Sequence, residues 1–154
     1  MELETVRLKK EQGIATIMLN RPNRLNALNR TLARDVATAL NDIKADPQVR
    51  VVVVTGAGRG FCAGGDFKGD EKALPGTKLK PPEFVAMYRG EIGPVILGLQ
   101  GCNVPTIAMV NGPAYGIGFD IALACDMRIG SNQARFCVAW LRRAIIPAGG
   151  TTWL

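Results

Sequence analysis

The sequence predicts a single α/β domain. Two observations indicate this class. Short segments that are β-branched or that alternate polar and apolar residues recur along the 154 residues, and stretches with helical spacing separate them. The hydrophobic share of 47% is ordinary for a globular protein with a core of its own.

The chain is predicted to begin with a β-hairpin and a helix. Polar and apolar residues alternate over Thr5–Lys9, Glu11–Gly13 turns the chain, and Ile14–Leu19 forms a second strand. A loop over Arg24–Leu28 follows, and the helix is expected over Thr31–Ala45. Its apolar stripe consists of Leu32, Val36, Leu40 and Ile43.

A β-branched run over Arg50–Thr55 predicts a strand buried on both faces. Gly56–Gly60 follows it, so a dinucleotide-binding loop has to be considered. That fingerprint needs a third glycine where Phe61 stands, and no Gly-Lys-Ser/Thr follows, so a surface turn is favoured. The glycines in Phe61–Asp66 allow another backbone or a ligand to approach closely.

The middle of the chain reads as an exposed loop over Lys68–Pro82, then a helix over Glu83–Gln100 that Pro94 should kink or break. Thr106–Val110 has the length and composition of a buried strand.

The end of the chain predicts further short elements. They are a strand at Met127–Ile129, an apolar segment at Phe136–Trp140, a turn at Pro147–Gly150 and the start of a helix at Thr151–Leu154.

The segment Val110–Asp126 is the most informative one. Gly116 and Gly118 leave room for close backbone approach, and helical spacing begins at Phe119. Asp120 is therefore expected in the first turn of a helix, where the dipole favours an ionised carboxylate and free N–H groups can receive an anion. Two interpretations remain open at this point: an active-site corner, or a tight glycine corner in which Asp120 caps the helix.

Composition narrows the function. The net charge of +6, from 19 basic and 13 acidic residues, suits a phosphorylated ligand, whereas no basic stretch is interleaved with aromatic residues as nucleic-acid binding would require. The absence of histidine excludes Ser-His and Cys-His nucleophilic sites and most zinc sites, and we expect no metal.

The cysteines indicate the compartment. Cys62, Cys102, Cys125 and Cys137 show no CxxC spacing, which predicts reduced, mostly buried thiols in a cytoplasmic protein. No signal peptide and no apolar run of membrane-spanning length is apparent.

Four segments, in this order, carry a resemblance to a known family. They are Ile14–Leu19 followed by NRPNRLNAL, then VVVVTGAGRGFCAGGD, then PTIAMVNGPAYGIGFDIALACDMRI, and finally AIIPAGGT. Together they resemble the enoyl-CoA hydratase/isomerase superfamily, the crotonases.

The resemblance implies a spiral of repeated ββα units and an acyl-CoA thioester as substrate, with no covalently bound cofactor. It also implies a homotrimer or hexamer at the family's full length. Because family members usually continue through further helices, it predicts that residues 1–154 are a crotonase-like core domain, truncated relative to the family, with the C-terminal helical part missing.

The resemblance also assigns catalytic positions. The backbone N–H groups of Ala63 and Ile117 would hold the thioester oxygen as it becomes an enolate, although the family usually has glycine where Ile117 stands. Asp120 occupies the place of one catalytic glutamate and would act as general acid/base. Trp140 occupies the place of the second glutamate and cannot transfer a proton.

Binding positions follow in the same way. Residues expected at the CoA site are Arg24, Leu25, Ala27, Ala63, Gly64, Gly65 and Asp66, with Lys68 as a weaker assignment. The acyl pocket is expected to include Tyr115, Gly116 and Trp140, with Phe84, Met87 and Tyr88 as further apolar or aromatic lining. Asp126 is interpreted as structural.

Two functions remain open. The first is an acyl-CoA enzyme of the hydratase/isomerase type that works with one carboxylate. The second is a non-catalytic acyl-CoA-binding or assembly protein, in which Asp120 is a helix cap and Trp140 plugs the pocket. Dehalogenation of aryl-CoA thioesters is disfavoured, because Ala148 stands where those relatives carry a nucleophilic aspartate.

Overall fold

A computed structural model describes residues 3–67, 80–140, 147 and 149–154. Its main sheet has five strands in the order β1-β2-β3-β4-β6, and a second, smaller sheet pairs β5 with β7. The strands are β1 (Val6–Glu11), β2 (Ile14–Leu19), β3 (Val51–Gly56), β4 (Thr106–Val110), β5 (Pro113–Tyr115), β6 (Met127–Gly130) and β7 (Arg135–Cys137). The helices are the 3₁₀ turn η1 (Pro22–Arg24), α1 (Arg30–Lys44), α2 (Pro81–Met87), the π-helical turn η3 (Tyr88–Ile92), α3 (Gly93–Gln100) and α4 (Ile117–Ala124).

The hairpin prediction is confirmed. β1 and β2 pair antiparallel, with Val6 opposite Leu19, whereas β2, β3, β4 and β6 pair parallel to one another. Parallel neighbours need a crossover between them, and helices provide those crossovers along this chain.

The crossovers repeat one pattern. After each of β2, β3 and β4 a short extended segment joins a second layer before the next helix begins. In that second layer Leu28 pairs with Gly65, Cys62 pairs with Ala114, and Ala114 pairs in turn with Phe136. This is the repeated ββα arrangement that the resemblance implies, and the α/β class is confirmed.

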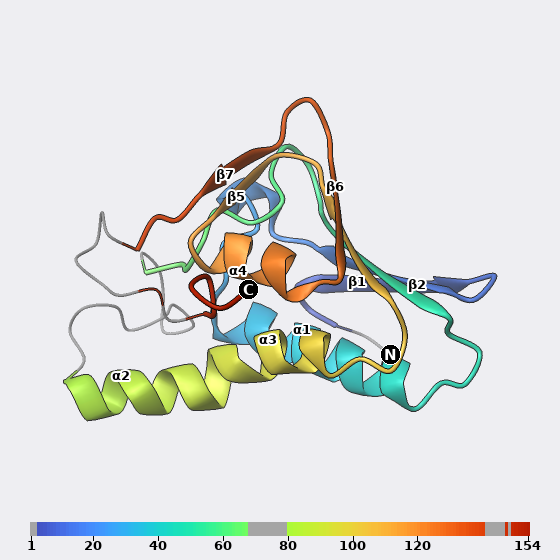
Figure 1. Cartoon of the computed structure of the whole chain (residues 1–154), viewed down its shortest axis with the longest axis horizontal. Helices are drawn as coiled ribbons and strands as arrows, with labels where there is room; N and C mark the ends of the chain where they lie inside the picture. The colour runs from blue at the N-terminus through green and yellow to red at the C-terminus, as the bar shows by residue number, and fades with distance from the viewer. Residues whose placement is uncertain (1–2, 68–79, 141–146, 148) are drawn as a thin grey trace.

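The core lies between the main sheet and the helices that pack on its inner face (Figure 1). The predicted stripe of α1 is buried, since Leu32, Val36, Leu40 and Ile43 are each at most 3% exposed. Asn29 caps α1 by accepting the Leu32 N–H at 2.9 Å, which fixes where the helix begins. Asp35 ties α1 to the start of the sheet, because its Oδ2 accepts both the N–H and the hydroxyl of Thr5 at 2.8 Å.

The break predicted at Pro94 takes the form of a π-helical turn. α2, η3 and α3 follow one another as a nearly continuous rod (Figure 1), and η3 ends immediately before α3 begins. Pro94 has no N–H and its ring crowds the preceding turn, so the wider π turn absorbs the mismatch without ending the rod.

Several expectations differ from the structure. α4 begins at Ile117, two residues before the predicted start, and β5 was not expected at all. Thr151–Leu154, predicted to start a helix, forms turns, and Leu154 N–H donates to Gly150 O at 2.8 Å with the spacing of a single helical turn. The strand β3 is less buried than predicted, since Val51 and Val53 are half-buried on the outer face.

No helix within the described residues is long and apolar enough to cross a membrane.

Candidate active site

A cavity of about 250 Å³ lies where the loop after β3 meets the start of α4. It brings together seven of the residues that the sequence assigned to the site, although they lie far apart along the chain. Its lining consists of Ala63, Gly64, Gly65, Phe67, Tyr115, Gly116, Ile117, Ala139 and Trp140.

One wall of this cavity is the entry into α4. Gly116 has φ +50° and ψ −123°, a conformation that residues with a side chain rarely adopt, and it occupies the N-cap position. Ile117 is therefore the first helical residue, and its N–H has no acceptor among the described residues. The Ile117 side chain is buried, so the residue packs into the core while its N–H remains unengaged.

The loop after β3 lies directly against that helix start. A side chain on Gly118 would overlap the carbonyl oxygen of Cys62, so this contact requires glycine. Cys62 also pairs with Ala114 of β5, and Tyr115 N–H donates to Cys62 O at 3.0 Å. These contacts hold the loop and α4 next to each other.

The N–H of Ala63, assigned by resemblance as the first oxyanion donor, is already engaged. It donates to Leu25 O at 3.0 Å, which leaves no proton for a ligand oxygen. Gly65, two residues later, has a free N–H within the described part of the chain. Leu28 N–H donates to Gly64 O at 2.7 Å and Asp66 N–H to Leu28 O at 2.8 Å, so the N–H of Gly65 points away from Leu28.

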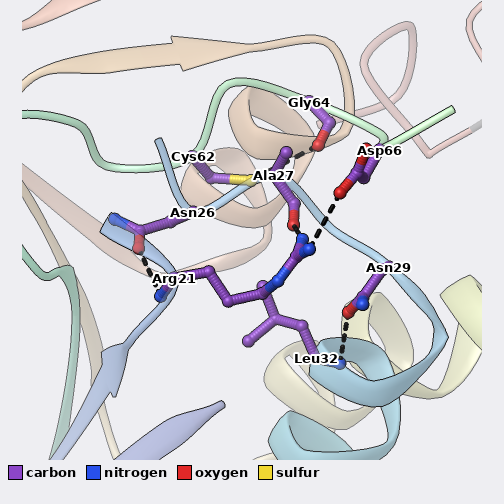
Figure 2. Close-up of polar contacts among 8 residues, drawn as sticks. All are labelled: Arg21, Asn26, Ala27, Asn29, Leu32, Cys62, Gly64 and Asp66. Carbon is purple, nitrogen blue, oxygen red and sulfur yellow. Dashed lines mark hydrogen bonds and ion pairs between the residues drawn. The ribbon is translucent and has the colours of Figure 1, made fainter. Parts of the chain in front are cut away.

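The residues predicted at the CoA site form the rim behind this loop. Arg24 is exposed at the end of η1, and Leu25 contributes the carbonyl that accepts the Ala63 N–H. Ala27 O accepts a hydrogen bond from Arg21 Nη1, and Asp66 Oδ2 forms an ion pair with Arg21 Nη2 at 2.9 Å (Figure 2). Asp66 thus faces a protein cation.

Asp120 lies in the first turn of α4, as predicted, and is fully buried. The alternative in which it caps the helix is wrong, since Gly116 holds the N-cap position and the carboxylate Oδ1 instead accepts the Thr151 hydroxyl. Burial raises the pKa of Asp120 to about 6, although the hydrogen bond from Thr151 and the nearby indole N–H of Trp140 oppose that rise.

Trp140 connects Asp120 to the cavity. Its indole lines the cavity wall, and its N–H is close enough to favour the charged form of Asp120. That approach falls short of hydrogen-bond geometry, because both Trp140 Nε1 and Asp120 Oδ2 are buried without a hydrogen-bond partner in the described structure. The residue that the resemblance places at the second acid is thus a hydrogen-bond donor.

Comparison with known proteins decides the family. The model of the enoyl-CoA hydratase/isomerase family matches residues 9–154. The chain belongs to the enoyl-CoA hydratase/isomerase family. A probable enoyl-CoA hydratase of Mycobacterium tuberculosis is 36% identical to it over 155 residues, which cover 99% of this chain and 57% of the relative.

Two further members of the family extend the comparison. The 1,2-epoxyphenylacetyl-CoA isomerase of Escherichia coli is 36% identical, over 94% of this chain and 54% of its own length. A crystal structure of an enoyl-CoA hydratase from Geobacillus kaustophilus superposes with a TM-score of 0.85 at 31% identity, over 99% of this chain and 56% of that chain. The chain therefore spans little more than half the length of the relatives it matches.

A second cavity, of about 550 Å³, lies between α3 and Gly149–Gly150. Tyr88, Ile92 and Ile96 contribute to it from η3 and α3, and Gly149 contributes from the end of the chain. Gly149 packs so tightly against the Asp120 carboxylate that any side chain there would overlap it. Burial, with the charge of Asp120, raises the pKa of Tyr88 well above its usual value, so this phenol is neutral.

The remaining residues singled out in the sequence have structural roles, lie beside the site or lie outside the described residues. Asp126 is structural as predicted, because its Oδ2 accepts both the N–H and the hydroxyl of Thr106 at 2.8 Å. Lys68 and Ala148 lie outside the described residues. Phe84 is half-buried and stacks with Tyr88, with ring centroids 4.8 Å apart, whereas Met87 is a core residue.

Sequence reasoning missed three residues of this site. Phe67 and Ala139 line the first cavity, and Arg21 connects Ala27 to Asp66. The signal for Arg21 was its place in NRPNRLNAL, a segment read as a chain break followed by CoA contacts. Among the described residues no cluster of His, Cys, Asp and Glu could hold a metal ion.

Proposed function

We propose that this chain binds an acyl-CoA thioester and stabilises its enolate, as the core of an enzyme of the hydratase/isomerase type. The observation that carries this proposal is the pair of unengaged backbone N–H groups, Gly65 and Ile117, on one cavity beside a buried carboxyl. Donors fixed before the reaction stabilise a developing oxyanion, and losing one costs roughly 3 kcal/mol or more of transition-state stabilisation.

The donor assignment follows the geometry. Gly65 replaces Ala63 as the first donor, because the N–H of Ala63 is bonded to Leu25. Ile117 stays the second donor, since a residue at the start of a helix has no carbonyl within the helix to receive its N–H.

Asp120 is the proposed general acid/base. A pKa of about 6 is close to neutral pH, which suits a group that must both take up and release a proton. Trp140 offers a donor but no base, so the proposed chemistry moves one proton on and off the acyl group, as a double-bond shift does. Two-carboxylate hydration does not fit these residues.

The acyl group is proposed to be apolar and bulky. The larger cavity is bordered by Tyr88 and by aliphatic residues of η3 and α3, and Gly149 places it next to Asp120. The CoA part is assigned to the rim at Arg24, Leu25 and Ala27, where the exposed Arg24 suits a phosphate.

Assembly and compartment remain proposals as well. We propose a homotrimer or hexamer, as the family implies, which light scattering of the purified protein would test. A cytoplasmic location is proposed because all four cysteines are free thiols in the structure.

The alternative, an acyl-CoA-binding protein without turnover, is favoured by one observation. Asp120 is fully buried behind Gly149 and Thr151, so a substrate reaches it only if these residues move.

A turnover screen separates the two functions. Short-chain, long-chain, alicyclic and arylacetyl enoyl- and epoxyacyl-CoA thioesters are offered to the protein and to Asp120→Asn, which keeps the shape of the side chain and removes the base. We expect isomerisation that falls about 10²-fold or more in the variant. Activity that persists in Asp120→Asn would rule out this acid, and binding without turnover of any thioester would select the alternative.

A further inference from the structure

Arg21 lies just after β2, and its guanidinium reaches two segments at once (Figure 2). Nη2 forms the ion pair with Asp66 Oδ2 at 2.9 Å, and Nη1 donates to Ala27 O. One side chain thereby joins the loop that carries Gly65 to the segment that carries the proposed CoA contacts.

Arg21 is itself held in place by Asn26. The Arg21 N–H donates to Asn26 Oδ1 at 2.8 Å, and the Asn26 N–H donates to Arg21 O at 2.9 Å. Asn26 is fully buried and also donates through Nδ2 to Ala57 O and Gly60 O, at 2.9 and 2.7 Å. These hydrogen bonds fix the backbone of Arg21, from which the guanidinium extends.

The ends of the Gly65 loop are fixed in the same place. Leu28 bonds to Gly64 on one side of Gly65 and to Asp66 on the other, and the Arg21 ion pair holds the Asp66 side chain. Because the direction of the Gly65 N–H depends on these anchors, moving Asp66 would turn the donor.

The segment Leu25–Ala27, which Arg21 contacts through Nη1, has a backbone conformation that other contacts must stabilise. Leu25 and Asn26 both have left-handed backbones, at φ +49° and +56°, which for a leucine costs about 1–3 kcal/mol. Such a conformation persists when surrounding contacts determine it, and the Arg21 contact to Ala27 is one of these.

The ion pair is suited to precise positioning. The Arg21 and Asp66 side chains are only 17% and 8% exposed, so solvent screens the pair weakly. A planar guanidinium directs two donors at fixed angles, whereas a lysine ammonium offers a single point charge that cannot serve both acceptors with the same geometry.

We propose that Arg21 is a positioning residue for the oxyanion donor: through Asp66 and Ala27 it sets the direction of the Gly65 N–H. This inference rests on the proposed function, since it presumes that Gly65 receives the thioester oxygen. It predicts that loss of the guanidinium impairs recognition of the enolate more than recognition of CoA.

The test uses the whole chain and two probes. Acetoacetyl-CoA forms an enolate with a near-ultraviolet absorbance, and CoA lacks the thioester altogether. Affinities for both are measured by calorimetry, and the enolate absorbance is recorded at constant pH. The variants are Arg21→Lys and Asp66→Asn, and Arg34→Lys is the matched control because Arg34 is 68% exposed on α1 and makes its ion pair with Asp35 outside the cavity.

We expect each of Arg21→Lys and Asp66→Asn to lower the preference for acetoacetyl-CoA over CoA about tenfold, the scale of one weakened hydrogen bond. The enolate absorbance should fall in parallel, the affinity for CoA should fall less than the affinity for acetoacetyl-CoA, and Arg34→Lys should match the parent. The double variant should lose no more than either single variant.

Amide hydrogen exchange supplies a readout without ligand. In both variants exchange should accelerate at Leu28 and Asp66, whose N–H groups are hydrogen-bonded at the two ends of Gly65, while the amides of α1 keep their protection. An unchanged preference, an equal loss of affinity for both probes, or unchanged exchange at Leu28 and Asp66 would overturn the inference. If the parent binds neither probe, the proposed function fails, and the exchange data still decide whether Arg21 holds the loop.

Discussion

Trp140 Nε1 and Asp120 Oδ2 are a buried donor and a buried acceptor that influence each other without forming a hydrogen bond. Each is left without a partner in the described structure, and burying such atoms is costly. Trp140 lines the cavity, and Asp120 carries the carboxyl whose pKa is raised, so the pair connects the two. Burial raises the pKa of Asp120 most, and Trp140 acts with Thr151 in the opposite direction.

Replacing Trp140 by phenylalanine tests this relationship. The Trp140→Phe variant keeps an aromatic ring but removes the N–H that lowers the pKa of Asp120, so the pKa of Asp120 should rise above about 6. Carboxyl NMR titration measures it, with Asp120→Asn to assign the resonance. Trp153→Phe is the matched control, since Trp153 is 87% exposed. An unchanged midpoint in Trp140→Phe would mean that the indole does not act on the carboxyl.

The buried carboxyl should also make stability depend on pH. The pKa of Asp120 is about 6 in the folded state against an ordinary value of 3.8, so the folded protein binds this proton more tightly than the unfolded chain does. Stability contributed by the protonated form is therefore present at low pH and lost as pH rises from about 4 to about 7, by about 2–3 kcal/mol.

Denaturant unfolding of the parent and of Asp120→Asn at several pH values measures that loss. The asparagine variant has no proton to release, so its stability relative to the parent should increase across this interval. A constant difference between the two proteins from pH 4 to pH 7 would contradict the raised pKa.

The contact between Gly149 and Asp120 predicts that a methyl group added at position 149 destabilises the protein. A Cβ at Gly149 would overlap the Asp120 carboxylate, so Gly149→Ala should lower the free energy of unfolding by about 1–3 kcal/mol. Gly90 in η3 has no atom within 4 Å of such a Cβ. Gly90→Ala should thus be neutral or should stabilise by up to about 1 kcal/mol, and thermal unfolding of both variants provides the comparison.

The cap of α1 is a separate test, away from the site. Asn29→Ala removes the side chain that accepts the Leu32 N–H, and the free energy of unfolding should fall by about 1 kcal/mol. Asn41→Ala, at an exposed position within the same helix, is the control and should cost nothing. Equal effects of the two substitutions would show that Asn29 does not stabilise the helix start.

Much of the fold could be predicted from periodicity alone. Ile14–Leu19 is β2 to the residue, and the stripe of α1 is buried, because both elements have one apolar face on the core. β5 could not be foreseen, since Pro113–Tyr115 is a three-residue strand that exists through its pairing with β7 and Cys62. Such a segment has no periodicity of its own.

The sequence predicted seven residues that line the first cavity, but not the hydrogen bonds around it. The glycine corners correctly indicated where two backbones approach each other. Which N–H remains free depends on the partner that a folded neighbour offers, and Leu25, almost forty positions earlier in the sequence, engages the N–H of Ala63. Arg21 was overlooked for the same reason, because its contacts to Ala27 and Asp66 form only in the folded chain.

The walls of the first cavity come from widely separated parts of the chain, and this has a consequence for biosynthesis. Ala63 and Trp140, which both line it, are 77 positions apart, since 140 minus 63 is 77. At ordinary rates of translation, about 4–15 s pass between the synthesis of these two residues. A chain emerging from the ribosome exposes its glycine loop throughout that interval, whereas a chain refolding from denaturant has both walls from the start.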